Sequence, residues 1–322
     1  MTTSPVPPTH PPRGAESLTF ARRWWTYQRE RFPIVAHGAL ILAFSFCAVS
    51  LSRMLRQEPG WPGAAQLLVA FATCFAFFLQ LRIADEFKDY HDDLQHRPYR
   101  PVQRGVVTLK ELAVLFVLGA LVQLLGALWL NPKLLGLLVV TWLYLAAMSK
   151  EFFIAGWLRD QPVLYMLSHM VIMPLVDLYA TGTDWLSLQH YPPHGLIWFL
   201  LASYCNGLVI EIGRKIRSPG DEEPGVSTYS RLWGRRVAVG AWCAALLATT
   251  AFALITAHHL GHVRVVGTIL VLCLAGAASV GVWFARHPAP GRGKRIEQCA
   301  GVWTLVLYLS LGLVPHFFKG PI

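Results

Sequence analysis

The stretch "PGAAQLLVAFATCFAFFLQLRIADEFKDYHDD", residues 62–93, joins a long apolar run to a dense acidic segment. Residues 62–84 are mostly apolar, and about 20 such residues are enough for a helix to cross a hydrocarbon core of about 30 Å. Residues 85–93 then hold five carboxylates in nine positions. This pattern predicts a membrane-spanning helix, and it raises the question of what so much negative charge binds at the end of that helix.

Apolar stretches of similar length recur along the whole chain, which is 54% hydrophobic and only 14% charged. Such a composition is unlike that of a soluble domain of this length. We therefore predict an all-α fold, a polytopic membrane bundle of about nine transmembrane helices. Their approximate ranges are 34–55, 62–84, 108–130, 134–150, 161–181, 195–212, 236–257, 263–285 and 300–318.

The lysines and arginines alternate between the loops that this count creates. Cytoplasmic loops carry an excess of these residues, and all but five of the 28 fall on the side that holds the N-terminus. The five exceptions are Arg53, Arg56, Lys133, Arg264 and Lys319. We expect a cytoplasmic N-terminus and an external C-terminus, in a bacterial cytoplasmic membrane. The net charge of +10 favours anionic lipid or phosphorylated substrates as partners, and we expect no nucleic acid.

The chain divides into three predicted parts. Residues 1–16 are rich in Pro, Ser and Thr, as disordered tails are. Residues 17–33 mix aromatic and basic side chains, which predicts an amphipathic helix lying in the headgroup region. Residues 34–322 form one transmembrane domain, and no stretch outside the membrane is long enough for a second one.

The acidic segment has the spacing of a metal site. If the second span continues as a helix to about residue 93, Asp85, Asp89 and Asp93 share one face, and Glu86 lies one step around from them. Like charges at this spacing destabilise a helix by a few tenths of a kcal/mol per pair. A divalent cation removes that repulsion, and Mg²⁺ is typically bound by one or two carboxylates together with water and phosphate oxygens.

Arginines follow the acidic segment directly, in "LQHRPYRPVQRG". Arg97, Arg100 and Arg104 are suited to bidentate hydrogen bonds with phosphate oxygens. An ordinary charged helix end on the cytoplasmic side would explain these arginines, but it leaves the acidic row unexplained. The segment therefore favours a site for a phosphorylated ligand and Mg²⁺.

Residues 85–105 resemble the first signature of the UbiA superfamily of intramembrane prenyltransferases. That signature is Asn-Asp-x-x-Asp-x-x-x-Asp, followed by Arg-Pro and Gly. Asp85 takes the Asn position, and the three acidic positions are filled by Glu86, Asp89 and Asp93. Arg100-Pro101 and Gly105 follow at the family's spacing.

The segment "DEEPGVSTYSRLWG", residues 221–234, resembles the family's second acidic signature, although the Asp expected four residues before Asp221 is Arg217 here. The resemblance leaves two alternatives. In the first, Glu211 replaces the missing acid, and Glu222 is a second candidate for that position. In the other, the basic residues Arg214, Lys215 and Arg217 bind phosphate directly, and the second metal is weak or absent.

Lys150, at the inner end of the fourth predicted span, resembles a lysine that the family uses to contact diphosphate. The Tyr that usually precedes it by four residues is Ala146 here. Positive residues are also common at cytoplasmic span ends, so the position alone does not decide its role.

The resemblance implies Mg²⁺-dependent transfer of a prenyl group from an allylic prenyl diphosphate to a hydrophobic acceptor, aromatic or lipid, with release of diphosphate. The implied catalytic residues are Asp85, Glu86, Asp89, Asp93, Glu211 and Asp221. The implied Mg²⁺ ligands are Glu86, Asp89, Asp93, Glu211, Asp221 and Glu222. The implied diphosphate-binding residues are Arg97, Arg100, Lys150, Arg214, Lys215 and Arg217. Aromatic candidates for stabilising an allylic cation are Trp142, Tyr144, Tyr165, Trp198 and Tyr204.

Two other functions stay open at this point. Transfer of a sugar phosphate onto a polyprenyl phosphate is compatible with the same resemblance and with the basic run 214–217. A transporter or a non-catalytic relative is the other alternative, although transporters place ionisable residues near the bilayer midplane and here they cluster at one predicted membrane face. The acceptor, the prenyl length and the oligomeric state are not specified by the sequence.

Overall fold

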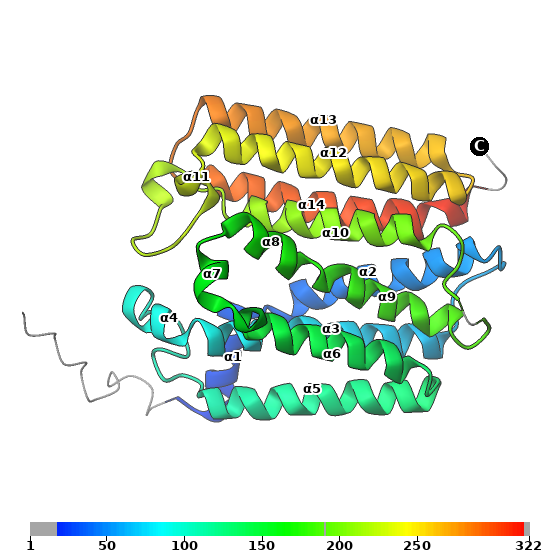
Figure 1. The fold of residues 1–322 in the computed structure, drawn as a ribbon, viewed down its shortest axis with the longest axis horizontal. Coiled ribbons are helices and arrows are strands. Elements are labelled where there is room, and N and C mark those ends of the chain that lie inside the picture. The colour runs from blue at the N-terminus through cyan, green and yellow to red at the C-terminus, as the bar shows by residue number, and fades with distance from the viewer. Residues whose placement is uncertain (1–17, 190, 319–322) are drawn as a thin grey trace, which may run out of the picture.

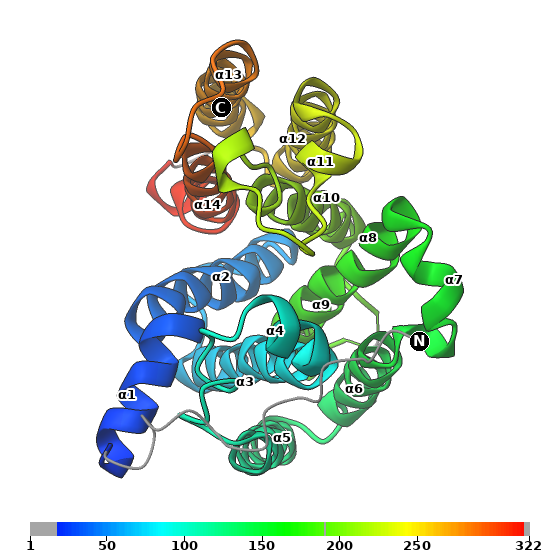
Figure 2. The ribbon, with the colours of Figure 1, turned by 90° about the vertical axis from the view of Figure 1, so that its left-hand side faces the viewer.

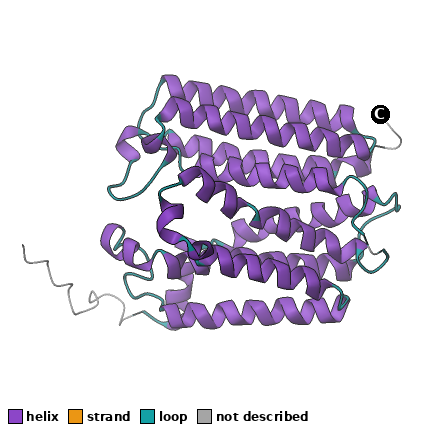
Figure 3. Cartoon of the chain, viewed as in Figure 1, coloured by secondary structure: helices purple, strands orange, loops and turns teal. Residues whose placement is uncertain are grey.

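The computed structural model describes residues 18–189 and 191–318, and every regular element within them is helical (Figure 3). The predicted all-α class is therefore confirmed. The tail predicted to be disordered, residues 1–16, lies outside the described residues, as does Lys319.

The long helices run side by side in one bundle (Figure 1). They are α2 (Ile34–Leu55), α3 (Ala64–Lys88), α5 (Leu109–Leu130), α6 (Leu134–Ser149), α10 (Leu196–Arg214), α12 (Arg235–His259), α13 (Val263–Arg286) and α14 (Gly293–Gly312). The shorter α-helices are α1 (Phe20–Arg31), α4 (Tyr90–His96), α7 (Ala155–Arg159), α8 (Pro162–Met170), α9 (Ile172–Trp185) and α11 (Tyr229–Leu232). Three 3₁₀ turns, η1 (Glu151–Phe153), η2 (Pro219–Asp221) and η3 (Val314–Phe317), complete the described elements.

Seven helical segments among the described residues are long and apolar enough to cross a membrane. They agree with seven of the predicted spans. The predicted spans 134–150 and 300–318 correspond to α6, an apolar helix of 16 residues, and to α14, whose first turns carry Lys294, Arg295 and Glu297. Both lie alongside the other long helices in Figure 1. The count of nine spans stays a prediction.

The predicted span 161–181 is two helices, α8 and α9, which meet at Val171. Pro174 lies in the first turn of α9. Proline has no N–H, and its ring clashes with the carbonyl four residues earlier, here that of Met170. The break therefore follows from the sequence, and it sets α8 at an angle to the bundle at the end where the acidic residues lie (Figure 1).

The bundle closes on itself. From α2 each long helix packs against the next, through α3, α5, α6, α9, α10, α12 and α13 to α14, and α14 packs back against α2. Figure 2 shows this arrangement from the end where α4 lies. Contact between α14 and α2 is close: a Cβ on Gly312 would lie 2.4 Å from the backbone of Cys47. On the outer helix α5, Val117, Leu121 and Leu125 are exposed, as expected for side chains that face lipid.

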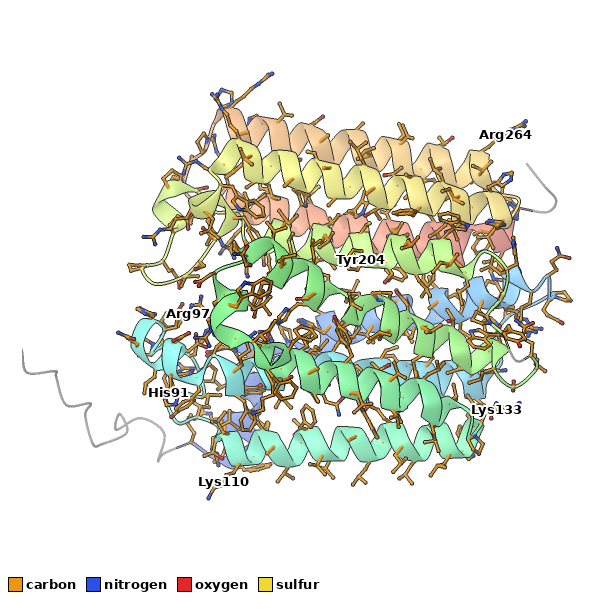
Figure 4. The ribbon with its side chains drawn as sticks, viewed as in Figure 1. His91, Arg97, Lys110, Lys133, Tyr204 and Arg264 are labelled. Atoms are coloured by element: carbon orange, nitrogen blue, oxygen red, sulfur yellow. The ribbon has the colours of Figure 1, made fainter. Side chains whose placement is uncertain are left out.

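The charged residues labelled in Figure 4 divide between the two ends of the bundle. His91, Arg97 and Lys110 lie at one end, whereas Lys133 and Arg264 lie at the other (Figure 4). We call the first one the acidic end, because it holds the segment 85–93. This separation agrees with the predicted alternation of basic loops, and the assignment of the acidic end to the cytoplasm stays a prediction.

Helix α1 is fixed at the acidic end by ion pairs. Arg23 contacts Glu111 at the start of α5 at 2.8 Å, and Arg104 contacts Glu30 at 2.8 Å.

At the opposite end Asp184 is buried and accepts hydrogen bonds from Arg56 at 2.9 and 3.0 Å. Asp184 is therefore structural, and the polar contacts at that end hold α9 against α2.

Candidate active site

The first acidic segment forms a nearly continuous helix, as the sequence predicts. Helix α3 ends at Lys88 and α4 begins at Tyr90, with Asp89 as the junction. The backbone N–H of Asp89 still donates to the carbonyl of Asp85 at 2.9 Å, and that of Asp93 to the carbonyl of Asp89 at 2.8 Å. The spacing of four residues between these three carboxylates is therefore kept across the junction.

Two carboxylates of this segment are already paired with arginines. Glu86 is fully buried and bonds Arg31 of α1. Asp93 is buried between Arg97, at 3.2 Å, and Arg100. One oxygen of Glu86, Oε2, is buried without a hydrogen-bond partner. These two acids hold α1 and the loop after α4 in place, and they orient the two arginines that were predicted to bind phosphate.

Three carboxylates of the segment are not enclosed by such pairs: Asp85, Asp89 and the exposed Asp92. Asp85 and Asp89 lie one helical turn apart, and we call these two the available carboxylates. The Asp85 side chain is 44% exposed, and its ion-pair partner is Arg82 at 3.6 Å. Asp89 makes no ion pair with any described residue. Its pKa is raised above the usual value, first by burial and then by the negative charge of Asp85. Two carboxylates that disfavour each other's charge are a suitable place for a cation.

Glu211, the predicted substitute for the missing acid, lies near the end of α10 with a buried side chain. It contacts Arg214 at 2.6 Å and Lys215 at 2.8 Å. Glu211 therefore holds two basic residues at the end of α10 that lies at the acidic end of the bundle (Figure 1).

The remaining acids of the second segment point to other partners. Asp221 accepts a hydrogen bond from the backbone N–H of Gly291 at 2.7 Å. Glu222 accepts hydrogen bonds from Thr228 at 2.6 Å and Ser230 at 2.8 Å. Arg217 contacts Glu297 of α14 at 3.1 Å. These contacts fold the loop and fasten it to the bundle, and none of them joins the first acidic segment.

The two loops nevertheless meet, through a residue that the sequence did not single out. Glu223 lies 3.5 Å from Arg97 and accepts a hydrogen bond from Tyr99 at 3.1 Å. Gly225 has a φ of +76°, and a Cβ there would lie 2.4 Å from the His96 ring. Only glycine fits both this backbone conformation and this approach. The second loop is thus packed directly on α4.

Lys150 is exposed at the end of α6 and has no ion pair with any described residue. Another lysine takes the buried position nearby. Lys88 hydrogen-bonds the hydroxyl of Tyr165, lies 4.8 Å from the centre of that ring, and is 3.6 Å from buried Glu151. Arg159 also contacts Glu151, at 3.3 Å. Lys88, the chain neighbour of Asp89, is therefore held by Tyr165 and Glu151, whereas Lys150 makes no ion pair with a described residue, and its predicted role stays a prediction.

The backbone at Glu151 is strained. Glu151, Phe152 and Phe153 have φ values of 48°, 54° and 62°, in the left-handed region that residues other than glycine rarely adopt. Consecutive residues of this kind persist only where the surroundings enforce them, and they cluster at functional sites. Here the turn directs Glu151 inward, toward Lys88.

Three of the five aromatic candidates gather around α8 at the acidic end. The hydroxyls of Tyr144 and Tyr204 donate to the carbonyls of Ser168 and Leu167, at 2.5 and 3.1 Å. Tyr165 stacks on His169, with ring centres 3.9 Å apart. The other two are placed differently: the indole N–H of Trp142 donates to Gln123, and Trp198 stacks on Phe252 near the start of α10.

The described residues contain no group of three His, Cys, Asp or Glu side chains that already converge on one point. The donors present nevertheless fit Mg²⁺, because this ion needs only one or two carboxylates and completes its shell with water and phosphate oxygens. Asp85 and Asp89 would supply those two carboxylates. The other predicted ligands, Glu86, Asp93, Glu211, Asp221 and Glu222, each bond protein groups in this structure, and their role in holding a metal stays a prediction.

Some of these residues could have been found in the sequence. Lys88 lies inside the acidic stretch, and Glu151 is an acid at the end of an apolar span, which is a functional signal by itself. Glu223 follows two acids that were singled out. Arg31 had no such signal, because its pairing with Glu86 depends on how α1 folds back on α3.

A family model described as the UbiA prenyltransferase family matches residues 41–317. Among solved structures, the apo structure of a UbiA homolog from Aeropyrum pernix K1 aligns with a TM-score of 0.63 and 16% identity, over 84% of this chain and 96% of that one. A structure of digeranylgeranylglyceryl phosphate synthase aligns with a TM-score of 0.58 and 13% identity, over 92% and 99%. At these identities the structures show a shared fold alone. Curated protein sequences gave no match.

Proposed function

Because the chain belongs to the UbiA prenyltransferase family, we propose that it transfers a prenyl group from an allylic prenyl diphosphate to an aromatic or lipid acceptor. Its apolar helices and its family make it an integral membrane protein. The proposed reaction takes place at the acidic end, on the cytoplasmic side of the membrane. The donor is an allylic diphosphate, and the products are the prenylated acceptor and diphosphate.

The observation that carries this proposal is the contrast between Asp89 and its surroundings. Asp89 has no ion pair among the described residues, whereas the basic side chains of both segments are paired with carboxylates. Arg97 and Arg100 share Asp93, with Glu223 also 3.5 Å from Arg97, and Arg214 and Lys215 share Glu211. These four basic groups and three acids leave one net positive charge, which is less than the negative charge that a diphosphate brings. Binding therefore needs an added cation, and Asp85 and Asp89 are suited to hold it.

Mg²⁺ held by Asp85 and Asp89 would neutralise diphosphate charge as it becomes a leaving group. The chain's own residues do the remaining work. Lys88, fixed by Tyr165 and Glu151, donates hydrogen bonds to diphosphate oxygens from one side. Arg214 and Lys215 do so from α10, because an anion of higher charge competes with Glu211 for their N–H groups.

The bond changes follow from the donor. The allylic carbon–oxygen bond breaks, and its electron pair leaves with the diphosphate. The acceptor nucleophile then forms a new bond to that carbon and loses one proton. Developing positive charge on the allyl group is favoured beside aromatic faces, and Tyr144, Tyr165 and Tyr204 around α8 are the candidates nearest to Lys88. The prenyl tail extends into the apolar interior of the bundle.

No observation favours sugar-phosphate transfer over this reaction. That alternative relied on the basic run 214–217. Arg217 pairs with Glu297, and Arg214 and Lys215 are equally suited to the diphosphate of a prenyl donor, so they do not favour a sugar phosphate. A transporter is also disfavoured, because most of the ionisable residues that the structure describes lie near the ends of the helices. Asp177, which is buried within α9, is held by a hydrogen bond from Tyr308.

The test is an activity measurement on the full chain in liposomes. Radiolabelled allylic diphosphates of increasing chain length are incubated with lipid-soluble aromatic acceptors, with isoprenoid glycerol phosphates and with no acceptor. Each is assayed with Mg²⁺ and with EDTA. We expect prenylated product in the organic phase and stoichiometric release of diphosphate, both only with Mg²⁺.

Two outcomes would contradict the proposal. Radiolabel transferred from a sugar-linked donor to polyprenyl phosphate, with no consumption of allylic diphosphate, would establish the alternative transfer. Retention of intact allylic diphosphate by the protein with every acceptor and every chain length would indicate a non-catalytic relative.

A further inference from the structure

A second cluster of positive charge at the acidic end lies outside the candidate active site. A pocket of about 470 Å³ opens between the start of α12 and the end of α13. Its lining includes Arg235 and Arg236 from α12 and Arg286 from α13, together with Trp233 and Val237. We call it the basic pocket. None of these residues contacts the acidic segment 85–93 or Glu211.

The arginines of the basic pocket have no carboxylate partners among the described residues. Glu297, on α14, contacts Arg217 at 3.1 Å and is thereby occupied. Arg292, just before α14, and Arg295, in its first turn, stack on Trp283 of α13 and add positive charge near the pocket. Each basic cluster of the candidate active site includes a carboxylate, whereas the arginines of the basic pocket have none among the described residues. The pocket therefore has an excess of positive charge that an anion would balance.

The backbone at this point also favours an anion. Helix α12 begins at Arg235 with no acidic residue in its first turn and no side chain capping it. The first N–H groups of a helix lack intrahelical partners and form the positive end of its dipole. Arg235 and Arg236 in that first turn oppose the dipole. A bound anion relieves the conflict, and it accepts hydrogen bonds from backbone and side chains together.

The surroundings of the pocket are apolar on the side toward the membrane. Val237 is 60% exposed, and Leu247 and Val282 are also exposed on the outer faces of α12 and α13. In a bilayer these side chains face lipid acyl chains. Trp233 lies at the same level as the arginines, as tryptophans do at membrane interfaces. A ligand that fits both parts carries a phosphate at one end and hydrocarbon chains at the other.

We propose that the basic pocket binds the phosphate headgroup of an anionic membrane lipid, with the acyl chains lying along α12 and α13. Zwitterionic lipids fit less well, because their own cationic group would face the arginines. The site does not depend on prenyl transfer, so it stands or falls independently of the proposed function.

The experiment is native mass spectrometry of the full-length protein in detergent, titrated with an equal mixture of dioleoyl phosphatidylglycerol and dioleoyl phosphatidylcholine. We expect one phosphatidylglycerol to be retained in at least about tenfold preference over phosphatidylcholine, since each nearby basic residue favours an anionic headgroup. The pocket variant Arg235→Gln/Arg236→Gln/Arg286→Gln should lose this preference to within about twofold.

A matched control removes the same charge elsewhere at the acidic end. The variant Arg22→Gln/Arg29→Gln/Lys110→Gln changes three exposed residues of α1 and α5. It should keep the preference of the unmodified protein, and so should the conservative variant Arg286→Lys. Equal losses in the pocket and control variants would overturn the proposal, as would equal retention of the two lipids by the unmodified protein.

Inorganic phosphate separates the two possible sources of the anion. Added at the concentration of the lipid, it should not displace phosphatidylglycerol, because it lacks the acyl chains that contact α12 and α13. Complete displacement would show that the pocket is a site for free phosphate, and it would contradict the assignment to lipid. Melting temperatures of all variants without lipid verify that each is folded.

Discussion

The first acidic segment, residues 85–93, and the second, residues 221–234 with Glu211 before it, both resemble acidic signatures of the family but differ in what their carboxylates bond. In the first, Asp85 and Asp89 are available at the mouth of the bundle, and Asp89 has a raised pKa. In the second, Glu211, Asp221 and Glu222 are each bonded to protein groups. The comparison teaches that an acidic motif supplies carboxylates, while their pairing decides whether they bind a cation or hold the protein together.

The largest effect should follow removal of the available charge. We expect Asp89→Asn to lower prenyl transfer by at least about 100-fold, because a cation-binding charge at the leaving group is lost. Its melting temperature without Mg²⁺ should not fall, since a buried charge facing Asp85 is removed. Asp92→Asn, at an exposed position of α4, should stay within about twofold in activity. Similar losses in both variants would show that Asp89 has no special role.

A second comparison separates the two lysines. Lys88→Met should weaken donor binding about tenfold and should destabilise the protein by about 1–3 kcal/mol, because buried Glu151 keeps only Arg159 as a partner. Lys150→Met changes an exposed residue. It should leave donor binding within about twofold and the stability within about 0.5 kcal/mol of the unmodified protein. The measurements are KM for the allylic diphosphate and the melting temperature. If Lys150→Met has the larger effect on KM, the resemblance to the family's lysine outweighs the contacts described above.

The contact between the two segments can be broken at Gly225. Gly225→Ala should destabilise the protein by about 1–2 kcal/mol and lower activity several-fold, because it adds both backbone strain and a clash with His96. The matched control is the same change in a His96→Ala background, where the ring that an added Cβ would meet is absent. The difference between the two losses of melting temperature isolates the contact with His96. Equal losses would mean that the second loop does not press on α4.

The smallest effect concerns pH. The pKa of Asp89 is raised in the folded protein, so its buried charge destabilises the Mg²⁺-free protein above that pKa, and this penalty is relieved as the pH falls through it. Mg²⁺ binds the charged form only. The rise in melting temperature on adding Mg²⁺ should therefore shrink as the pH falls through the raised pKa of Asp89. This loss should begin at a higher pH than for an ordinary aspartate. Asp89→Asn should show a small rise at every pH, and a strong, pH-dependent rise in that variant would contradict the assignment.

The helices and the family were predictable because hydrophobic length and motif spacing are local properties of the sequence. Even the break between α8 and α9 follows from Pro174. The pairing of charges was not predictable, because it depends on contacts between distant segments. Arg31 reaches Glu86 only once α1 folds back over the end of α3. Asp221 accepts a hydrogen bond from the backbone N–H of Gly291, which is far along the chain. The sequence therefore identified carboxylates in the right segments without showing which were available.

The most direct test of the central claim is Mg²⁺-dependent binding of a radiolabelled allylic diphosphate to the purified protein and to two variants. The account predicts that binding requires Mg²⁺, that Asp89→Asn abolishes it, and that Asp221→Asn retains it within about threefold, because an asparagine oxygen can still accept the hydrogen bond from Gly291. Loss of binding in both variants would contradict the account, since it would show that the second acidic segment also holds a metal.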